Sequence, residues 1–409
     1  MQKSKLQSKI QNWRKVKLGE ILAEIESGGR PTGGALMINK GIPSIGAEHL
    51  DDRGGFDFSS LKYVPEKYFN NSVRGKIKEG DILVVKDGAT IGKVSRVSKN
   101  FPFPDAMVNE HVFIVRGKRE LVDQTFLFYK ISTREGKETI KNSVGGSAQG
   151  GLKKDFLNHW EIYLPNLSNQ KRIADVLSTF DERIEMNNKI SKNLEEMAQA
   201  IFKEWFAVAF EALAKGDELP PKGWEMKKAE ELLNFEKGVE PGFSAYSTKE
   251  KEGFIPFYRV RDLDKQSGVD VFIKKDLADG KICKEDDILL SLDAVIGRVK
   301  IGCKGAFSSG IRKVYSKDGF IRNSFIYFWL KSPYVQNTIL EYSSGTSILH
   351  AGQSIKFLKF PFNKSLIEKF QKKADPIFNK ILENIKENQK LAALRDLLLP
   401  KLMSGKIRV

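Results

Sequence analysis

Cysteine and histidine are scarce in this sequence. Its 409 residues include 2 cysteines and 4 histidines. Cys283 and Cys303 show no Cys-x-x-Cys spacing, and no His-Glu-x-x-His motif occurs, so we expect neither a disulfide framework nor a metal site. Sparse, unpaired cysteine is typical of the reducing cytosol, which predicts a cytoplasmic protein.

Long apolar runs and nucleotide-binding loops are also missing. No stretch of about 18 apolar residues is present, and the first residues lack the apolar core of a signal peptide, so we expect no membrane association. The segment 88–94 resembles a phosphate loop only superficially, because three residues rather than four separate Gly88 from Gly92 and Val94 stands in place of Ser or Thr. We interpret it as a hairpin turn. Since amino-methyltransferase and dinucleotide motifs are absent too, we expect no catalytic residue and no cofactor in this chain.

Positive charge, by contrast, is abundant. The 68 Lys and Arg residues exceed the 52 Asp and Glu residues, which gives a net charge of +16. Such a surplus favours a nucleic-acid partner, because cations placed on phosphates release counterions. A merely lysine-rich surface is the alternative.

The chain contains an imperfect internal repeat with a period near 210 residues. Matched segments follow one another in the same order in both copies: 13–17 with 224–228, 28–32 with 238–242, 41–45 with 253–257, 78–83 with 284–289, 91–94 with 296–299, 143–147 with 343–347, and 162–165 with 357–361. The repeat predicts two similar domains, each followed by a helix.

The fold class that we predict is mixed α/β (α+β), with two pseudo-repeated globular domains joined by two long antiparallel coiled-coil helices. Short β-rich runs at 81–85 and 112–115 predict strands, whereas 124–140 and 322–342 predict helices with aromatic faces. The expected boundaries are a first domain at 1–165, a long helix at 166–215, a second domain at 216–364 and a C-terminal helix at 365–409.

Both long helices carry apolar residues at heptad spacing, which is typical of a coiled-coil seam. The expected seam residues are Ile173, Leu177, Phe180, Ile184, Asn187, Ser191, Leu194, Ala198, Ile201 and Trp205 in the first helix, and Ile367, Phe370, Ala374, Ile377, Ile381, Ile385 and Asn388 in the second. Asp181 falls outside the seam, Pro376 should kink or break the second helix, and Pro400 should stop it. The alternative is a pair of ordinary packing helices.

Polar and basic residues on glycine-containing loops are the candidate DNA contacts, because Lys and Arg neutralise phosphates while Arg and Gln also read base edges. They are Arg30, Thr32, Lys86, Thr90, Lys93, Ser147 and Gln149 in the first copy, and Arg259, Arg261, Ser291, Arg298, Arg312, Thr346, Ser347, His350 and Gln353 in the second. The copies differ most in such positions, as at 48–53 compared with 261–266. We therefore expect two different half-sites. For any one residue, a solvated surface charge is the alternative.

Three segments, 169–177, 193–206 and 397–405, resemble the central and C-terminal conserved regions of the specificity subunits of Type I restriction-modification systems. The resemblance implies two target-recognition domains in inverted orientation that bind double-stranded DNA at a bipartite asymmetric site. It implies helices that set the spacer and dock two modification subunits. Restriction subunits would join the full complex, and S-adenosylmethionine, ATP and magnesium would be bound by these partners.

One departure from the family pattern is that Gln170-Lys171-Arg172 has no clean counterpart in the second copy, where 368–371 stands. Docking on the two copies is therefore expected to be less equal. Two other functions stay open: a self-contained DNA methyltransferase or endonuclease with its own recognition domains, and a coiled-coil scaffold without a DNA function.

Overall fold

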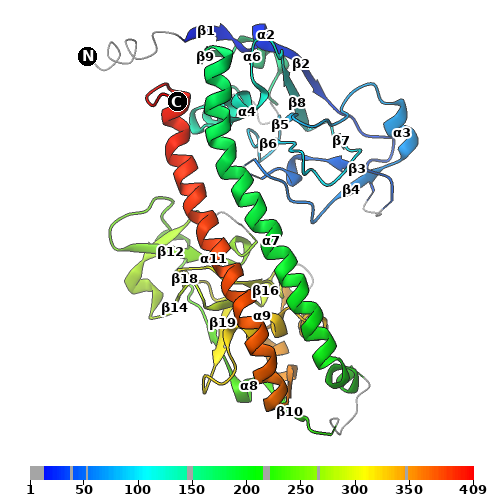
Figure 1. Cartoon of the computed structure of the whole chain (residues 1–409), viewed down its shortest axis with the longest axis vertical. Helices are drawn as coiled ribbons and strands as arrows, with labels where there is room; N and C mark the ends of the chain where they lie inside the picture. Colours follow the sequence, from blue (N-terminus) through cyan, green and yellow to red (C-terminus); the bar gives the residue numbers. More distant parts are fainter. Residues whose placement is uncertain are drawn as a thin grey trace. The chain divides into compact units, whose positions relative to one another are not determined.

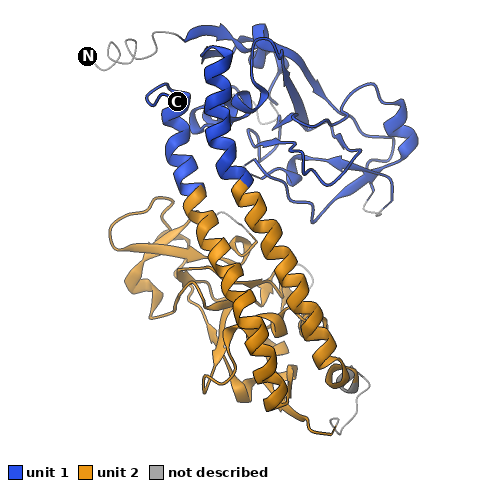
Figure 2. Ribbon diagram, in the orientation of Figure 1, with its two compact units in different colours: residues 1–182, 392–409 blue, residues 183–391 orange. Residues whose placement is uncertain are grey.

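The computed structural model describes residues 13–36, 40–51, 54–144, 151–214, 222–264, 268–345 and 349–409 (Figure 1). The chain divides into two compact units, unit 1 with residues 1–182 and 392–409, and unit 2 with residues 183–391 (Figure 2). Both boundaries fall inside the long helices α7 (Leu167–Ala214) and α11 (Lys364–Met403). Each unit therefore holds one globular domain and part of each long helix.

Unit 1 is built around a four-stranded antiparallel sheet in the order β2-β8-β5-β6, with a three-stranded sheet β4-β3-β7 and a ribbon β1-β9 beside it. Its strands are β1 (Arg14–Lys17), β2 (Leu22–Ser27), β3 (Ile42–Ile45), β4 (Lys62–Val64), β5 (Ile82–Val85), β6 (Val94–Arg96), β7 (Met107–Val108), β8 (Val112–Gly117) and β9 (Glu161–Leu164). Its shorter helices are α2 (Leu18–Ile21), η1 (Ala47–His49), α3 (Glu66–Asn71), α4 (Gln124–Ser132), α5 (Arg134–Asn142) and α6 (Lys154–His159).

The central strand β5 is buried on both faces, as its unbroken apolar sequence predicts. Ile82 and Val84 pack into the core that contains Phe126 of α4. Leu83 and Val85 point to the opposite face, because side chains alternate along a strand, and join a second core. The sheet is thus covered on both faces, which leaves its strand ends as the places where loops reach solvent.

Unit 2 repeats the main strand order of unit 1 and adds further short elements. Its sheets are β11-β19-β15-β17, β13-β12-β18-β14, the ribbon β10-β21 and the small pair β16-β20. Its strands are β10 (Glu225–Lys228), β11 (Leu233–Lys237), β12 (Phe254–Tyr258), β13 (Phe272–Lys274), β14 (Ile282–Cys283), β15 (Ile288–Ser291), β16 (Asp293–Ala294), β17 (Val299–Lys300), β18 (Gly305–Phe307), β19 (Ile311–Ser316), β20 (Leu349–His350) and β21 (Lys359–Phe362). Its shorter helices are α8 (Ala229–Leu232), η2 (Phe243–Ala245), η3 (Val260–Asp262), η4 (Lys275–Ala278), α9 (Asn323–Leu330), α10 (Pro333–Glu341) and η5 (Gly352–Phe357). The predicted fold class is confirmed.

The two long helices pair in antiparallel fashion within each unit. In unit 2, Asn187 Nδ2 donates to Asn388 Oδ1 at 2.9 Å, and Asn384 Nδ2 donates to Ser191 Oγ at 3.0 Å. In unit 1, Asp181 pairs with Arg395 at 2.5 Å. Asp181 was expected outside the seam, but it faces the other helix.

A buried glutamine near the start of each long helix fixes that helix to its globular domain. Gln170 Oε1 accepts from the backbone N–H of Asp123 at 2.8 Å, and Gln371 Oε1 accepts from that of Arg322 at 2.7 Å. In each unit the donor is the N-cap residue of a helix, and these two helices, α4 in unit 1 and α9 in unit 2, are equivalent. The expected lack of a counterpart for Gln170 is therefore wrong: Gln371 makes the same contact from a shifted sequence position.

Two prolines that were expected to interrupt the second long helix do not do so. The helix α11 runs unbroken through Pro376, because Phe370, Ala374 and Phe378 on both sides of it pack into one core. It also passes Pro400 and ends at Met403, followed by Gly405 at φ +66°, the left-handed position that favours glycine.

The segments 124–140 and 322–342 were each predicted as one helix, but each contains two. Thr133 and Ser332 start the second helix of their pair, and each accepts a hydrogen bond from the backbone N–H of the residue three positions later.

Candidate nucleic-acid interface

Most of the predicted contact residues that the structure describes gather at one end of the four-stranded sheet in each unit. In unit 1, the antiparallel pairs Ser27–Phe113, Val85–Val112 and Val84–Val94 bring four strand ends together. We call the loops at this place the loop end; in unit 1 they are 28–36, 46–51, 86–93, 109–111 and 151–152, and in unit 2 they are 238–243, 259–264, 292–298, 308–310 and 349–353.

The same backbone contacts hold the loop end together in both units. In unit 1, the N–H of Lys86 donates to His111 O at 3.0 Å, and the N–H of Leu152 donates to Lys86 O at 2.6 Å. In unit 2, Leu292 takes the place of Lys86: it donates to Gly310 O at 2.9 Å and accepts from the N–H of Ala351 at 2.7 Å. The scaffold under the loops is therefore common to the two units.

A matched glycine shows how closely the loops approach. A Cβ added at Gly28 would lie 1.6 Å from the carbonyl oxygen of Val108, and one added at Gly238 would lie 2.1 Å from that of Phe307. Only a residue without a side chain fits at either position. The two glycines therefore occupy equivalent positions, and the loops that follow them in the two units can be aligned residue by residue.

In unit 1, charged side chains from three loops form one network. His111 Nδ1 lies 2.6 Å from Asp87 Oδ1, and His111 Nε2 lies 3.2 Å from both the Arg30 guanidinium and Glu110 Oε1. Arg30 also forms an ion pair with Glu110. Since 57% of the Arg30 side chain is exposed, its guanidinium can reach a ligand from this network.

In unit 2, the positions equivalent to Arg30 and Glu110 carry different side chains. Glu240 Oε2 accepts from the Ser309 hydroxyl at 2.5 Å, and Asp293 Oδ1 lies 2.8 Å from His350 Nδ1. Burial lowers the pKa of Arg312, although the nearby carboxylate of Asp293 acts in the opposite direction. The same corner of the fold thus presents another arrangement of charge.

A short 3₁₀ turn contributes one exposed polar residue in each unit. His49 and Asp262 are buried at matching positions and accept from the backbone N–H of Gly46 at 2.8 Å and of Arg259 at 3.1 Å. These two residues therefore stabilise the turn, and the divergence at this place leaves Arg261 as the exposed cation. Arg259 is also bound internally, since its guanidinium donates to both oxygens of Asp262.

The predicted contact residues fall into four groups. Those exposed at the loop end are Arg30, Thr32, Arg261, His350 and Gln353. Those partly exposed, with their backbone or side chain in contact inside the unit, are Lys86, Thr90, Lys93, Arg259, Arg298 and Arg312. Ser147, Gln149, Thr346 and Ser347 lie outside the described residues. The fourth group is Ser291 alone, whose side chain is buried.

Ser291 does not fit a role in DNA contact. Its side chain is fully buried, its Oγ donates to Val295 O at 2.5 Å, and it accepts from the N–H of Arg298 at 2.9 Å. The hydroxyl shapes the turn after β15 and is not accessible to DNA.

Four residues of the loop end were missed as candidates: Asp87, Glu110, Glu240 and Asp293. All four are carboxylates, which repel phosphates but accept hydrogen bonds from base amino groups. The internal repeat aligns Asp87 with Asp293, and this match is the feature of the sequence that could have identified both residues as candidates.

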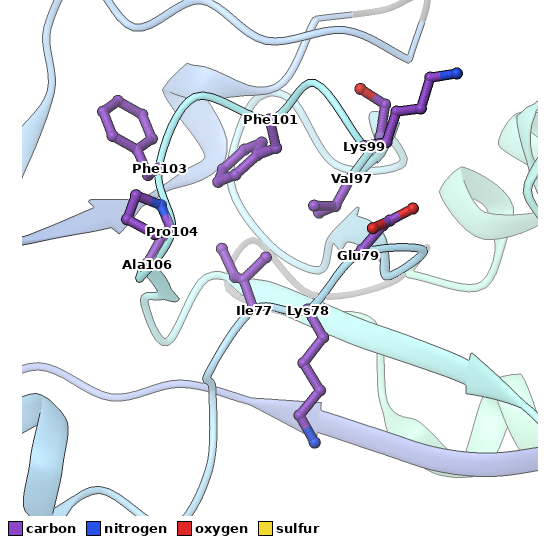
Figure 3. Close-up of a pocket in the computed structure, with 10 residues that line it drawn as sticks. Ile77, Lys78, Glu79, Val97, Lys99, Phe101, Phe103, Pro104 and Ala106 are labelled. Atoms are coloured by element: carbon purple, nitrogen blue, oxygen red, sulfur yellow. The ribbon is translucent and has the colours of Figure 1, made fainter.

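A separate pocket lies at the other end of the sheet of unit 1, where β6 ends and β5 begins. Figure 3 shows Ile77, Phe101 and Phe103 among its lining residues. Phe101 and Phe103 pack edge to face with ring centroids 5.7 Å apart. The described connection between β17 and β18 in unit 2 is much shorter, so this aromatic loop is a feature of unit 1.

Two further findings bear on function. Within the described part of the chain, no group of three or more His, Cys, Asp or Glu side chains is arranged to hold a metal ion. Of the helices that the structure describes, none combines the length and apolar character needed to cross a membrane.

Comparison with known proteins gives the family. The model of the Type I restriction modification DNA specificity domain matches this chain twice, at residues 10–196 and 221–393. The Type I restriction enzyme MjaIX specificity subunit of Methanocaldococcus jannaschii is 30% identical over 305 residues, which is 69% of each chain. The HindI specificity subunit of Haemophilus influenzae is 25% identical over 431 residues, 86% of this chain and 90% of that one.

A solved structure supports the fold. The S subunit of a Type I restriction-modification system from M. genitalium aligns with a TM-score of 0.51 at 20% identity, over 96% of both chains.

Proposed function

Because the chain belongs to the Type I restriction-modification DNA specificity family, we propose that it selects the DNA sequence for such a system and has no catalytic activity of its own. Each globular domain reads one half of a bipartite, asymmetric site in the major groove. Modification subunits supply S-adenosylmethionine and methylation, and restriction subunits supply ATP- and magnesium-dependent cleavage.

One observation supports this proposal most strongly: the two units share a scaffold but differ in the side chains at the loop end. The backbone bonds of Lys86 and Leu292 match, whereas Arg30 stands where unit 2 has Glu240. A repeated scaffold with different polar ends is what two readers of different half-sites require, since base edges are distinguished by their donors and acceptors.

Substitution of Arg261 by alanine tests this reading. In a complex with modification subunits, the variant should lose preference at one or two positions of a single half-site, at a cost of about 1–3 kcal/mol per base contact. Lys317→Ala is the control, because Lys317 is an exposed cation beyond the opposite end of β19. If Arg261→Ala leaves both half-sites as they were, or weakens both equally, the proposed base contact of Arg261 is wrong.

We also propose that the paired helices set the spacer between half-sites. Deleting one heptad from each helix, 184–190 and the facing 385–391, keeps the heptad pattern and shortens the pair by about 10 Å. That length corresponds to about three base pairs. Methylation of duplexes with graded spacers should shift its optimum by this amount; an unchanged optimum would refute the spacer role while leaving half-site reading intact.

The modification subunits are proposed to dock on α7. Met186, Ile190, Met197 and Val208 are exposed apolar residues that fall on one face of this helix, given about 100° per residue. An exposed apolar stripe of this kind marks a protein interface more often than a solvated surface. Met197→Glu should weaken co-purification with the modification subunit, whereas Lys192→Glu, at an exposed polar position of the same helix, should not.

A further inference from the structure

Two structurally equivalent positions form a side-chain pair in both units, but with opposite chemistry. Arg30 and Glu240 each follow the matched glycines by two residues, and Glu110 and Ser309 each follow the matched carbonyls of Val108 and Phe307 by two residues. Arg30 pairs with Glu110 in unit 1, and Glu240 pairs with Ser309 in unit 2. The contact is thus kept while the exposed member changes from a donor to an acceptor.

The strand pairing confirms that these positions correspond. The backbone N–H of Asn109 donates to Ile45 O at 3.0 Å, and that of Ser308 donates to Tyr258 O at 2.9 Å. Ile45 and Tyr258 are the last residues of the equivalent strands β3 and β12. Glu110 and Ser309 are therefore the next residues of the same turn in the two units.

The contacts inside each unit leave hydrogen-bonding capacity that faces solvent. The contacts described for Arg30 involve the NH2 nitrogen, whereas a guanidinium carries five N–H donors. Ser309 donates to Oε2 of Glu240, an exposed residue whose carboxylate can accept several hydrogen bonds. His111 helps to position Arg30: its Nε2 lies 3.2 Å from the Arg30 guanidinium, and its Nδ1 lies 2.6 Å from Asp87 Oδ1.

From this juxtaposition we infer that positions 30 and 110 in unit 1, and 240 and 309 in unit 2, are a specificity-determining pair for one base pair in each half-site. The inference rests on the proposed function. Arg30 donates to O6 and N7 of guanine, and Glu240 accepts from the amino group of cytosine, the pairings that major-groove geometry favours. Both residues thus read a G·C pair, but from opposite bases of it.

The reading predicts the effect of exchanging the pair. The double variant Arg30→Glu/Glu110→Ser reproduces the unit 2 arrangement in unit 1. After the wild-type motif has been read from methylated genomic DNA, methylation rates are measured with the full complex on duplexes altered one base pair at a time. One G·C position of the first half-site should lose its preference roughly 5- to 150-fold, and inversion of that pair to C·G should restore the rate. The second half-site should be unchanged.

Two further variants keep the test decisive if the double variant folds poorly. Arg30→Lys retains the charge but lacks the planar fork, so it should relax the same single position. The reciprocal Glu240→Arg/Ser309→Glu should alter one position of the second half-site only. If the motif is unaltered in these variants, or if the rate falls equally on every duplex as for a phosphate contact, the inference is overturned. A wild-type complex that methylates no bipartite motif would instead contradict the proposed function.

Discussion

Replacing Arg395 with methionine should destabilise unit 1 strongly, because the arginine neutralises a carboxylate between the two long helices. Arg395 lies 2.5 Å from Asp181, and Tyr129 of α4 donates to the other oxygen of this carboxylate at 2.5 Å. Burial alone would lower the pKa of Arg395, but its attraction to Asp181 and Asp396 outweighs burial and raises that pKa. The pair therefore joins α7, α11 and the globular domain.

The expected magnitude follows from exposure. The side chain of Arg395 is 9% exposed and that of Asp181 is 27% exposed. Removing one partner of a fully buried ion pair costs about 3–5 kcal/mol, and the partial exposure of Asp181 reduces this to about 2–4 kcal/mol. Amide hydrogens of β5 and β8 that exchange through unfolding of unit 1 should then lose protection by roughly 30- to 700-fold.

Two controls separate this explanation from a general effect of losing an arginine. Arg134→Met removes an exposed pair in the same unit, since the Arg134 side chain is 91% exposed, and should leave protection unchanged. Arg395→Met/Asp181→Asn removes the charge of the carboxylate but keeps an acceptor for Tyr129, and should regain most of the lost stability. If Arg395→Met behaves like Arg134→Met, or if the double variant is no more stable than the single one, the reasoning is refuted.

Three more predictions concern unit 2. Burial alone would raise the pKa of Glu236, but its lysine partners lower it, so Glu236→Gln should reduce stability at neutral pH, and the difference should shrink progressively in urea titrations once pH falls below the ordinary glutamate pKa of about 4.3. Burial raises the pKa of Cys283 and Cys303 to about 12, so iodoacetamide near pH 8 should label them only after unfolding, as mass spectrometry can show. Gln371→Leu should cost about 1–3 kcal/mol by leaving the N–H of Arg322 unpaired, measurable by chemical denaturation; an unchanged midpoint would contradict its anchoring role.

The fold could be predicted because its largest features are periodic in the sequence. The repeat predicts two equivalent domains. Heptad residues such as Leu177 and Phe370 predict which face of each long helix is buried. Finer features depended on single residues acting against the local pattern. Pro376 did not interrupt α11, since the packing of neighbouring turns outweighs one lost hydrogen bond, and Thr133 divided one predicted helix in two by capping the second.

The candidate interface was predicted only in part, because its residues are assembled from distant loops. The glycine-containing loops and Arg30 could be chosen by residue type, but Glu110 lies 80 positions further on, and no local pattern joins them. Burial also decides which polar residues are available, and the sequence does not show it directly: Asp262 is buried although it follows the exposed Arg261, and the candidate Ser291 is itself buried.

We propose that this chain alone sets a two-part DNA site for partner enzymes, and genome-wide detection of methylated bases tests this most directly. The host has the modification subunits and is compared with and without this chain. We expect methylation confined to one asymmetric bipartite motif with a fixed spacer, present only when the chain is expressed. Methylation at the same motif without the chain, or at a single continuous motif with it, would contradict the account.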